Sequence, residues 1–154
     1  MCSCKISAST RWLGQIGILR PNLSTTHRTR TNLRPGKDKV GRIDAISVET
    51  GRTLWSWETR VSNYSPILAT GGGLLFNGGM DRFLRALDAD SGQVLWQTRL
   101  ASQAMGYTVT FAVGGRQYIA VAAGGGFNVG ALRMTPEADG PSGGNAVYVF
   151  ALPQ

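Results

Sequence analysis

Residues 45–55 read AISVETGRTLW, and residues 86–96 read ALDADSGQVLW. The two stretches lie 41 residues apart and share Ala, an aliphatic residue, Thr or Ser before Gly, then Leu and Trp. A partial third copy, AVYVFAL at residues 146–152, keeps only the strand half of the pattern. A period of about 40 residues built from short strands is typical of a β-propeller blade. The repeat therefore predicts an all-β chain of four-stranded antiparallel blades.

The fixed positions of the repeat have structural roles. The Gly after Thr or Ser suits a hairpin turn, because it adopts positive φ at little cost. The small Ala leaves room for a neighbouring sheet, and the Trp offers a flat apolar surface and one N–H donor. We expect each Trp to stack on a Gly peptide and connect adjacent blades. These structural residues are Ala45, Gly51, Trp55, Ala86, Gly92 and Trp96.

The sequence pattern changes at Gly41. From there on, strand-like runs alternate with Gly and Asp turns. No segment demands a helix, and residues 124–145 form a long Gly- and Pro-bearing loop of the kind that is usually functional or mobile. The strands form a partial propeller of about two and a half blades. We expect strands near residues 42–48, 53–59, 66–70, 73–77, 82–88, 93–99, 107–113, 116–123 and 146–152.

Composition excludes several classes of protein. Of 154 residues, 42% are hydrophobic, 16% are charged and 21 are Gly. So few charges exclude an acidic disordered chain or a coiled coil, and the absence of a G-X-Y period excludes collagen. Two Cys cannot build a disulfide scaffold. The apolar runs fall far short of the roughly 18 residues of a transmembrane segment.

The net charge of +7 belongs to the N-terminal part of the chain. Residues 1–42 hold nine Lys or Arg and one acidic residue, whereas residues 43–154 hold seven Arg and eight acidic residues. The body therefore has no basic face for nucleic acid, and only weak, salt-sensitive binding through the tail stays open as an alternative. We expect residues 1–40 to be a basic, disordered, low-order tail. It has no clear signal peptide, although its Arg-rich character leaves a transit peptide open.

The repeat resembles the tryptophan-docking motif of the quinoprotein (PQQ-dependent) alcohol dehydrogenases, which are eight-bladed propellers. Three further stretches resemble that family: LATGGGLLFNG at 68–78, GGRQYIAVAAG at 114–124 and NAVYVFALP at 145–153. In order and spacing they resemble the C-terminal part of such an enzyme. The resemblance implies that residues 41–154 are C-terminal propeller blades and that residues 1–40 are not family-like.

This resemblance implies an activity and a cofactor. Members oxidise an alcohol, sugar or polyol to a carbonyl with PQQ beside Ca²⁺ or a lanthanide, and they pass electrons to a cytochrome or quinone in the periplasm. Their catalytic Asp and metal-ligating Glu and Asn lie upstream of the matched part. No catalytic or metal-binding residue is therefore assigned here. We expect this fragment alone to be inactive and to bind no cofactor tightly, and its exposed blade edges to need the rest of the propeller.

The resemblance also suggests residues near the cofactor. Asn63-Tyr64-Ser65 falls where relatives carry Trp-rich sequence near PQQ, and Ala104-Met105-Gly106-Tyr107 falls at a loop that approaches it axially. Core packing or loop placement also explains both segments, because aromatic residues dominate cores as well as pockets. The candidate cofactor-binding residues are Tyr64, Met105 and Gly106.

Other chemistry-bearing residues carry no site. Asp81 and Asp90 are expected to cap turns and Asp88 to bond backbone, because the acids lack the compact spacing of a Ca²⁺ loop. His27 is the only His, and Cys2-Ser3-Cys4 is not a C-x-x-C motif. The main alternative function is a non-enzymatic propeller-repeat protein that uses the blades as a binding scaffold.

Overall fold

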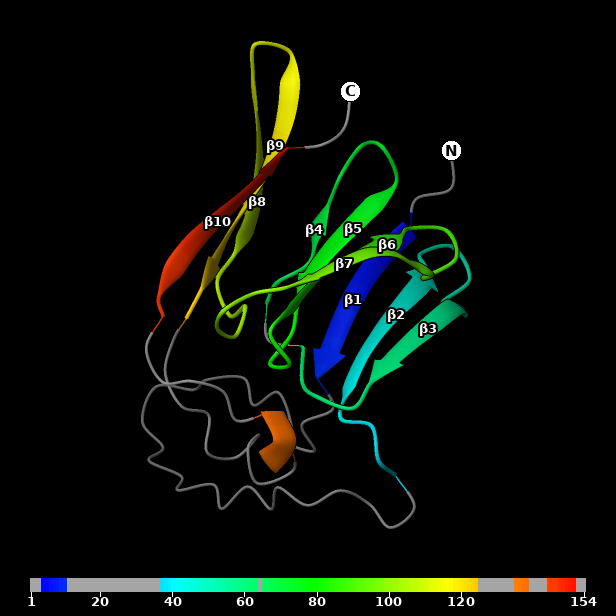
Figure 1. The fold of residues 1–154 in the computed structure, drawn as a ribbon. Coiled ribbons are helices and arrows are strands. Elements are labelled where there is room, and N and C mark those ends of the chain that lie inside the picture. The colour runs from blue at the N-terminus through cyan, green and yellow to red at the C-terminus, as the bar shows by residue number, and fades with distance from the viewer. Residues whose placement is uncertain (1–3, 11–36, 64, 125–134, 139–143, 152–154) are drawn as a thin grey trace, which may run out of the picture.

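The computed structural model describes residues 4–10, 37–63, 65–124, 135–138 and 144–151. Three antiparallel sheets follow one another along the chain and lie side by side like blades (Figure 1). The all-β prediction is confirmed, and the observed strands from residue 41 onward fall within the predicted ranges or one residue outside them. The described part contains no helix long and apolar enough to cross a membrane.

The first sheet has the order β1-β2-β3 and the second has the order β4-β5-β6-β7. The third has the order β10-β9-β8, and a short 3-10 turn precedes β10. The elements are β1 (Cys4–Thr10), β2 (Gly41–Ser47), β3 (Thr53–Thr59), β4 (Leu68–Ala69), β5 (Leu74–Gly78), β6 (Phe83–Asp88), β7 (Val94–Arg99), β8 (Thr108–Val113), β9 (Arg116–Ala123), η1 (Pro136–Ala138) and β10 (Ala146–Ala151).

The two copies of the repeat adopt the same local structure. Ala45 lies opposite Trp55, and Ala86 lies opposite Trp96. In both hairpins the register shifts directly after this Ala. The turn glycines have φ of 68° at Gly51 and 72° at Gly92, a left-handed conformation that favours glycine. The repeat thus encodes the last two strands of each of the first two blades.

Trp55 connects the first sheet to the second, as the repeat predicts. Its Nε1 donates a hydrogen bond of 3.0 Å to the carbonyl oxygen of Ala89. Its ring covers Gly92 so closely that a Cβ there would lie 2.7 Å from Cδ2 of the indole. Trp96 has a different neighbour, since its ring meets Phe150 of β10 edge-on at 5.4 Å, and it stays 41% exposed.

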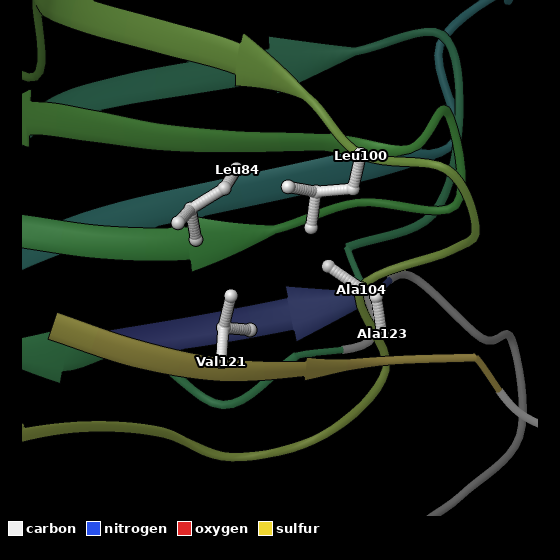
Figure 2. Packing of buried hydrophobic residues seen from close by; sticks show 5 residues of the cluster. All are labelled: Leu84, Leu100, Ala104, Val121 and Ala123. Carbon is white, nitrogen blue, oxygen red and sulfur yellow. The ribbon is translucent and has the colours of Figure 1, made fainter. Parts of the chain in front are cut away.

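The core lies between the second and third sheets. Figure 2 shows Leu84 and Leu100 facing Val121 and Ala123, with Ala104 at the strand ends. Two smaller clusters adjoin this core, one of Phe76, Ala86 and Ile119 and one of Val61, Met80 and Ala138. Apolar residues of β6 and β9 therefore hold the two blades together, since burial of such side chains is the dominant favourable term in folding.

The structure corrects the prediction of a low-order tail at one place. Cys4–Thr10, which we expected to lack regular structure, forms strand β1 and pairs antiparallel with β2. Backbone groups at a strand edge need hydrogen-bond partners, and this segment supplies them to β2. The 3-10 turn Pro136–Ala138 was also not predicted.

Candidate functional site

Two connecting segments, residues 61–65 after β3 and 102–106 after β7, meet at one end of the blades. They are also 41 residues apart, so each follows the last strand of its blade. The hydroxyl of Ser65 donates a hydrogen bond of 2.9 Å to the carbonyl oxygen of Gly106. The structure thus brings together the two segments that carry the predicted cofactor-binding residues.

A buried polar side chain contacts the same segment. Asn77 is fully buried, and its Nδ2 donates a 2.9 Å hydrogen bond to the carbonyl oxygen of Ser65. Among the described residues, the buried atoms without a hydrogen-bond partner include Oδ1 of Asn77, Oγ of Ser62 and Oγ1 of Thr108. An unsatisfied buried polar atom costs about 1–3 kcal/mol. A bound water or polar ligand would remove that cost at each of these atoms.

Close packing explains two glycines of the site. A Cβ at Gly78 would lie 2.9 Å from the carbonyl oxygen of Ala104, and a Cβ at Gly106 would lie 2.8 Å from the Cβ of Ala122. Side chains essentially never approach so closely, so both positions require glycine for close approach of backbone. Gly106 therefore has a packing role whether or not a cofactor lies nearby.

An open groove of about 460 Å³ lies beside Gly106. Among the described residues that line it, only Asn145 has a polar side chain, and Asn145 packs against Gly124. Met105 is half-buried and does not line this groove, and Tyr64 lies outside the described residues. Of the two candidates that the structure describes, Gly106 lies at a hollow surface and Met105 does not line it.

The loop between β9 and β10 contributes a turn that reaches the same end of the first two blades. Nε of Arg60 pairs with Oε1 of Glu137 at 2.8 Å, and Nε2 of Gln103 donates to the carbonyl oxygen of Ala138 at 3.3 Å. Sequence reasoning marked the loop as functional or mobile but missed these contacts. The sequence TPEA, at residues 135–138, carries the signal that was missed: Thr is a frequent N-cap, and Pro is frequent at the first helical position.

The acidic residues serve the fold. Oδ1 of Asp88 accepts hydrogen bonds from the backbone N–H and hydroxyl of Ser91, which lower the pKa of this carboxyl below its usual value. Asp81 accepts the N–H of Phe83 and pairs with Arg85. The predicted turn role of Asp81 and the predicted backbone bonding of Asp88 are confirmed, whereas the turn role of Asp90 stays a prediction.

Basic groups are likewise paired within the blades. Arg85 is only 8% exposed, and its guanidinium lies over the rings of Trp57 and Phe83. Asp44 holds Arg42 at 2.7 Å, and this hydrogen bond raises the pKa of the guanidinium. Among the described residues, no three His, Cys, Asp or Glu side chains gather as a metal site.

Comparison with known proteins identifies the blades. Residues 58–119, which include both site segments, match the β-propeller domain of glucose, ethanol and alcohol dehydrogenases that carries the name of the cofactor PQQ. These repeats belong to the PQQ β-propeller domain of the quinoprotein methanol and alcohol dehydrogenase family. The match confirms the resemblance seen in the sequence.

Individual relatives support the same assignment. Methanol dehydrogenase [cytochrome c] subunit 1 of Methylobacterium organophilum is 35% identical over 117 residues, which cover 76% of this chain and 19% of that protein. A lanthanide-dependent methanol dehydrogenase of Methylacidiphilum fumariolicum is 35% identical over 126 residues, or 77% of this chain and 21% of that protein. The chain thus spans about a fifth of the length of these curated relatives.

Solved structures of the family show the same fold. A europium-containing methanol dehydrogenase matches with a TM-score of 0.67 and 29% identity, over 76% of this chain and 24% of that one. The quinohemoprotein alcohol dehydrogenase of Comamonas testosteroni matches with a TM-score of 0.63 and 29% identity, over 72% of this chain and 16% of that one. The quinoprotein blades described here are therefore superposable on parts of complete enzymes.

Proposed function

We propose that these blades are the C-terminal part of a PQQ-dependent dehydrogenase that oxidises an alcohol, sugar or polyol to a carbonyl. The observation that carries the proposal is the contact between the segments 61–65 and 102–106. Both segments lie within the residues that match the PQQ propeller, and they meet through the Ser65–Gly106 hydrogen bond. The repeat itself does not require that contact.

We propose that this end of the blades forms one wall of a PQQ site. PQQ carries carboxylates and carbonyls, so it is rich in hydrogen-bond acceptors, and the orphaned hydroxyls of Ser62 and Thr108 are potential donors. Gly106 permits close approach of the backbone beside the groove. Tyr64 and Met105 are proposed as further cofactor contacts on the family resemblance alone. When bound, PQQ supplies the acceptor for the two electrons that leave the alcohol along with two protons.

The described residues do not fit a metal site, since no cluster of three potential ligands is found among them. We therefore derive no step through Ca²⁺ or a lanthanide for this chain. The catalytic base and the metal ligands belong, in this proposal, to other parts of the enzyme. Its electron acceptor is a cytochrome or quinone, and its compartment is the periplasm.

The size and activity of the native protein test this proposal. An antibody against residues 41–154 would capture the protein from its source, and intact mass would be measured beside PQQ-dependent dye reduction with alcohols. We expect a species several times heavier than 16.5 kDa that reduces dye only with PQQ. A species of 16.5 kDa without that activity would overturn the proposal in favour of a non-enzymatic scaffold.

A further inference from the structure

The first strand of the chain occupies a definite place in the repeat. β1 pairs with β2 through Cys4 opposite Ser47, Ile6 opposite Ala45 and Ala8 opposite Ile43. In the next blade, Leu74, Phe76 and Gly78 of β5 lie opposite Asp88, Ala86 and Leu84 of β6. These three residues of β6 come 41 positions after Ser47, Ala45 and Ile43 of β2. Position 4 of β1 therefore corresponds to Leu74 of β5, and the correspondence continues residue by residue.

The connections of the two strands are unrelated. β5 joins β6 through residues 79–82, whereas residues 11–40 separate β1 from β2. Figure 1 shows β1 lying along β2 as β5 lies along β6. The same place in the blade is therefore filled by a different part of the chain, from a region that shows no repeat.

The sequence of β1 suits this register. Ile43, Ala45 and Ser47 of β2 are buried, and the residues of β1 at the opposite positions are Ala8, Ile6 and Cys4. Lys5, Ser7 and Ser9 occupy the alternate positions, opposite half-buried residues of β2. Because strand faces alternate, a slip of one residue would exchange the polar and apolar sets. The alternation of apolar residues in β1 and the 41-residue repeat thus indicate the same register for β1 against β2.

We propose that Cys4–Thr10 is a substitute blade strand, which takes the place of the second strand of the first blade and covers the edge of β2. An uncovered edge presents unpaired N–H and C=O groups that recruit other chains. Strand addition satisfies these groups through the backbone, while alternate side chains set the register. This role is independent of the proposed dehydrogenase function, and its tests involve neither PQQ nor activity.

An engineered disulfide tests the register. Directly opposite residues of antiparallel strands have Cα atoms about 4.5–5.5 Å apart, within the range that a disulfide bridges. In a Cys2→Ser background, Ser47→Cys is expected to form an intrachain bond with Cys4 on mild oxidation, and peptide mapping by mass spectrometry would detect it. Ile46→Cys, one residue away, is the matched control and is expected to remain largely reduced.

The outcomes are separable. Equal cross-linking of Ile46→Cys and Ser47→Cys would show an unregistered segment and overturn the proposal. Linkage only between two chains would overturn it as well, because β1 would then cover a second copy. Ser47 Oγ also accepts the N–H of Thr50, so Ser47→Ala serves as a folding control for the lost turn contact.

Hydrogen exchange gives a second measurement. A proline at Ser7 removes a backbone donor from the middle of β1 and disrupts pairing. We expect Ser7→Pro to lower amide protection in β2 at least tenfold and to leave β6 unchanged. Lys37→Pro, at an exposed position outside any strand, is the matched control. Unchanged protection of β2 in Ser7→Pro would overturn the proposal.

Discussion

The docked tryptophan offers a quantitative test, because the two repeat glycines share a backbone conformation and only Gly92 lies against an indole ring. Gly51 and Gly92 have nearly the same φ, but a Cβ at Gly51 meets nothing within 4 Å, whereas a Cβ at Gly92 overlaps the ring of Trp55. A left-handed backbone costs a non-glycine residue about 1–2 kcal/mol. We expect Gly51→Ala to lower the free energy of unfolding by about that amount. Overpacking adds about 1–3 kcal/mol, so Gly92→Ala is expected to cost about 2–5 kcal/mol.

Urea unfolding followed by circular dichroism would measure both variants, and Trp55→Ala provides the decisive background. Without the indole, the extra cost at Gly92 should vanish and the two glycine substitutions should cost the same. The interaction energy from this double-mutant cycle isolates the contact from the shared backbone term. Equal costs of Gly51→Ala and Gly92→Ala in the wild-type background would refute the docking argument. An excess at Gly92 that persists without Trp55 would do the same.

Three further substitutions probe other contacts. The Ser91 hydroxyl lowers the pKa of Asp88 in the folded chain. This carboxylate therefore stabilises the fold above its ordinary pKa of about 4, and the contribution disappears as pH falls. Urea midpoints measured from pH 3 to 7 should consequently fall less at acid pH in Asp88→Asn than in the wild type. Asp81→Ala should lower the free energy of unfolding by about 2–3 kcal/mol, less than the roughly 3–5 kcal/mol of a fully buried pair, because Asp81 is 24% exposed. Replacing Arg85 by Met in the same variant should recover part of this stability in urea unfolding. Trp96→Ala should cost about 1–2 kcal/mol by the same assay, below the 3–5 kcal/mol of a buried aromatic residue, since Trp96 is 41% exposed.

The strands from residue 41 onward could be predicted because their period, their turns and their glycines agree. Gly51 and Gly92 fix the hairpins locally, and the sequence between them alternates as half-buried strands do. β1 was not predicted in this way, because the alternation in CKISAST spans only seven residues of a basic region that has no repeat and no flanking hairpin. Its pairing depends on the edge of β2, more than 30 residues away in the chain, and strand formation is decided largely by such context.

The candidate site was predictable only in part. Family resemblance placed Tyr64, Met105 and Gly106 near a cofactor, but no local pattern shows that Ser65 bonds to Gly106 across two blades. Gly106 follows a packing rule that needs the position of Ala122, a residue from another strand. Burial of Asn77 with an unpaired Oδ1 likewise depends on the folded arrangement. Contacts between blades therefore carry the information that the repeat alone lacks.

The division between repeat and site also separates the two candidate functions. Trp55, Gly92 and the alanines of the repeat account for how blades pack, and a scaffold and an enzyme need them equally. The buried Ser62 and Thr108 hydroxyls have no hydrogen-bond partner among the described residues, and an unpaired buried hydroxyl costs stability. A ligand that bonds them would offset that cost in an enzyme, whereas a scaffold offers no such compensation. Ser62→Ala and Thr108→Val should therefore stabilise the isolated chain while weakening PQQ binding in the longer enzyme. Thr53→Val, at an exposed position of β3, is the control for both measurements. Stabilisation without any loss of PQQ binding would favour the scaffold.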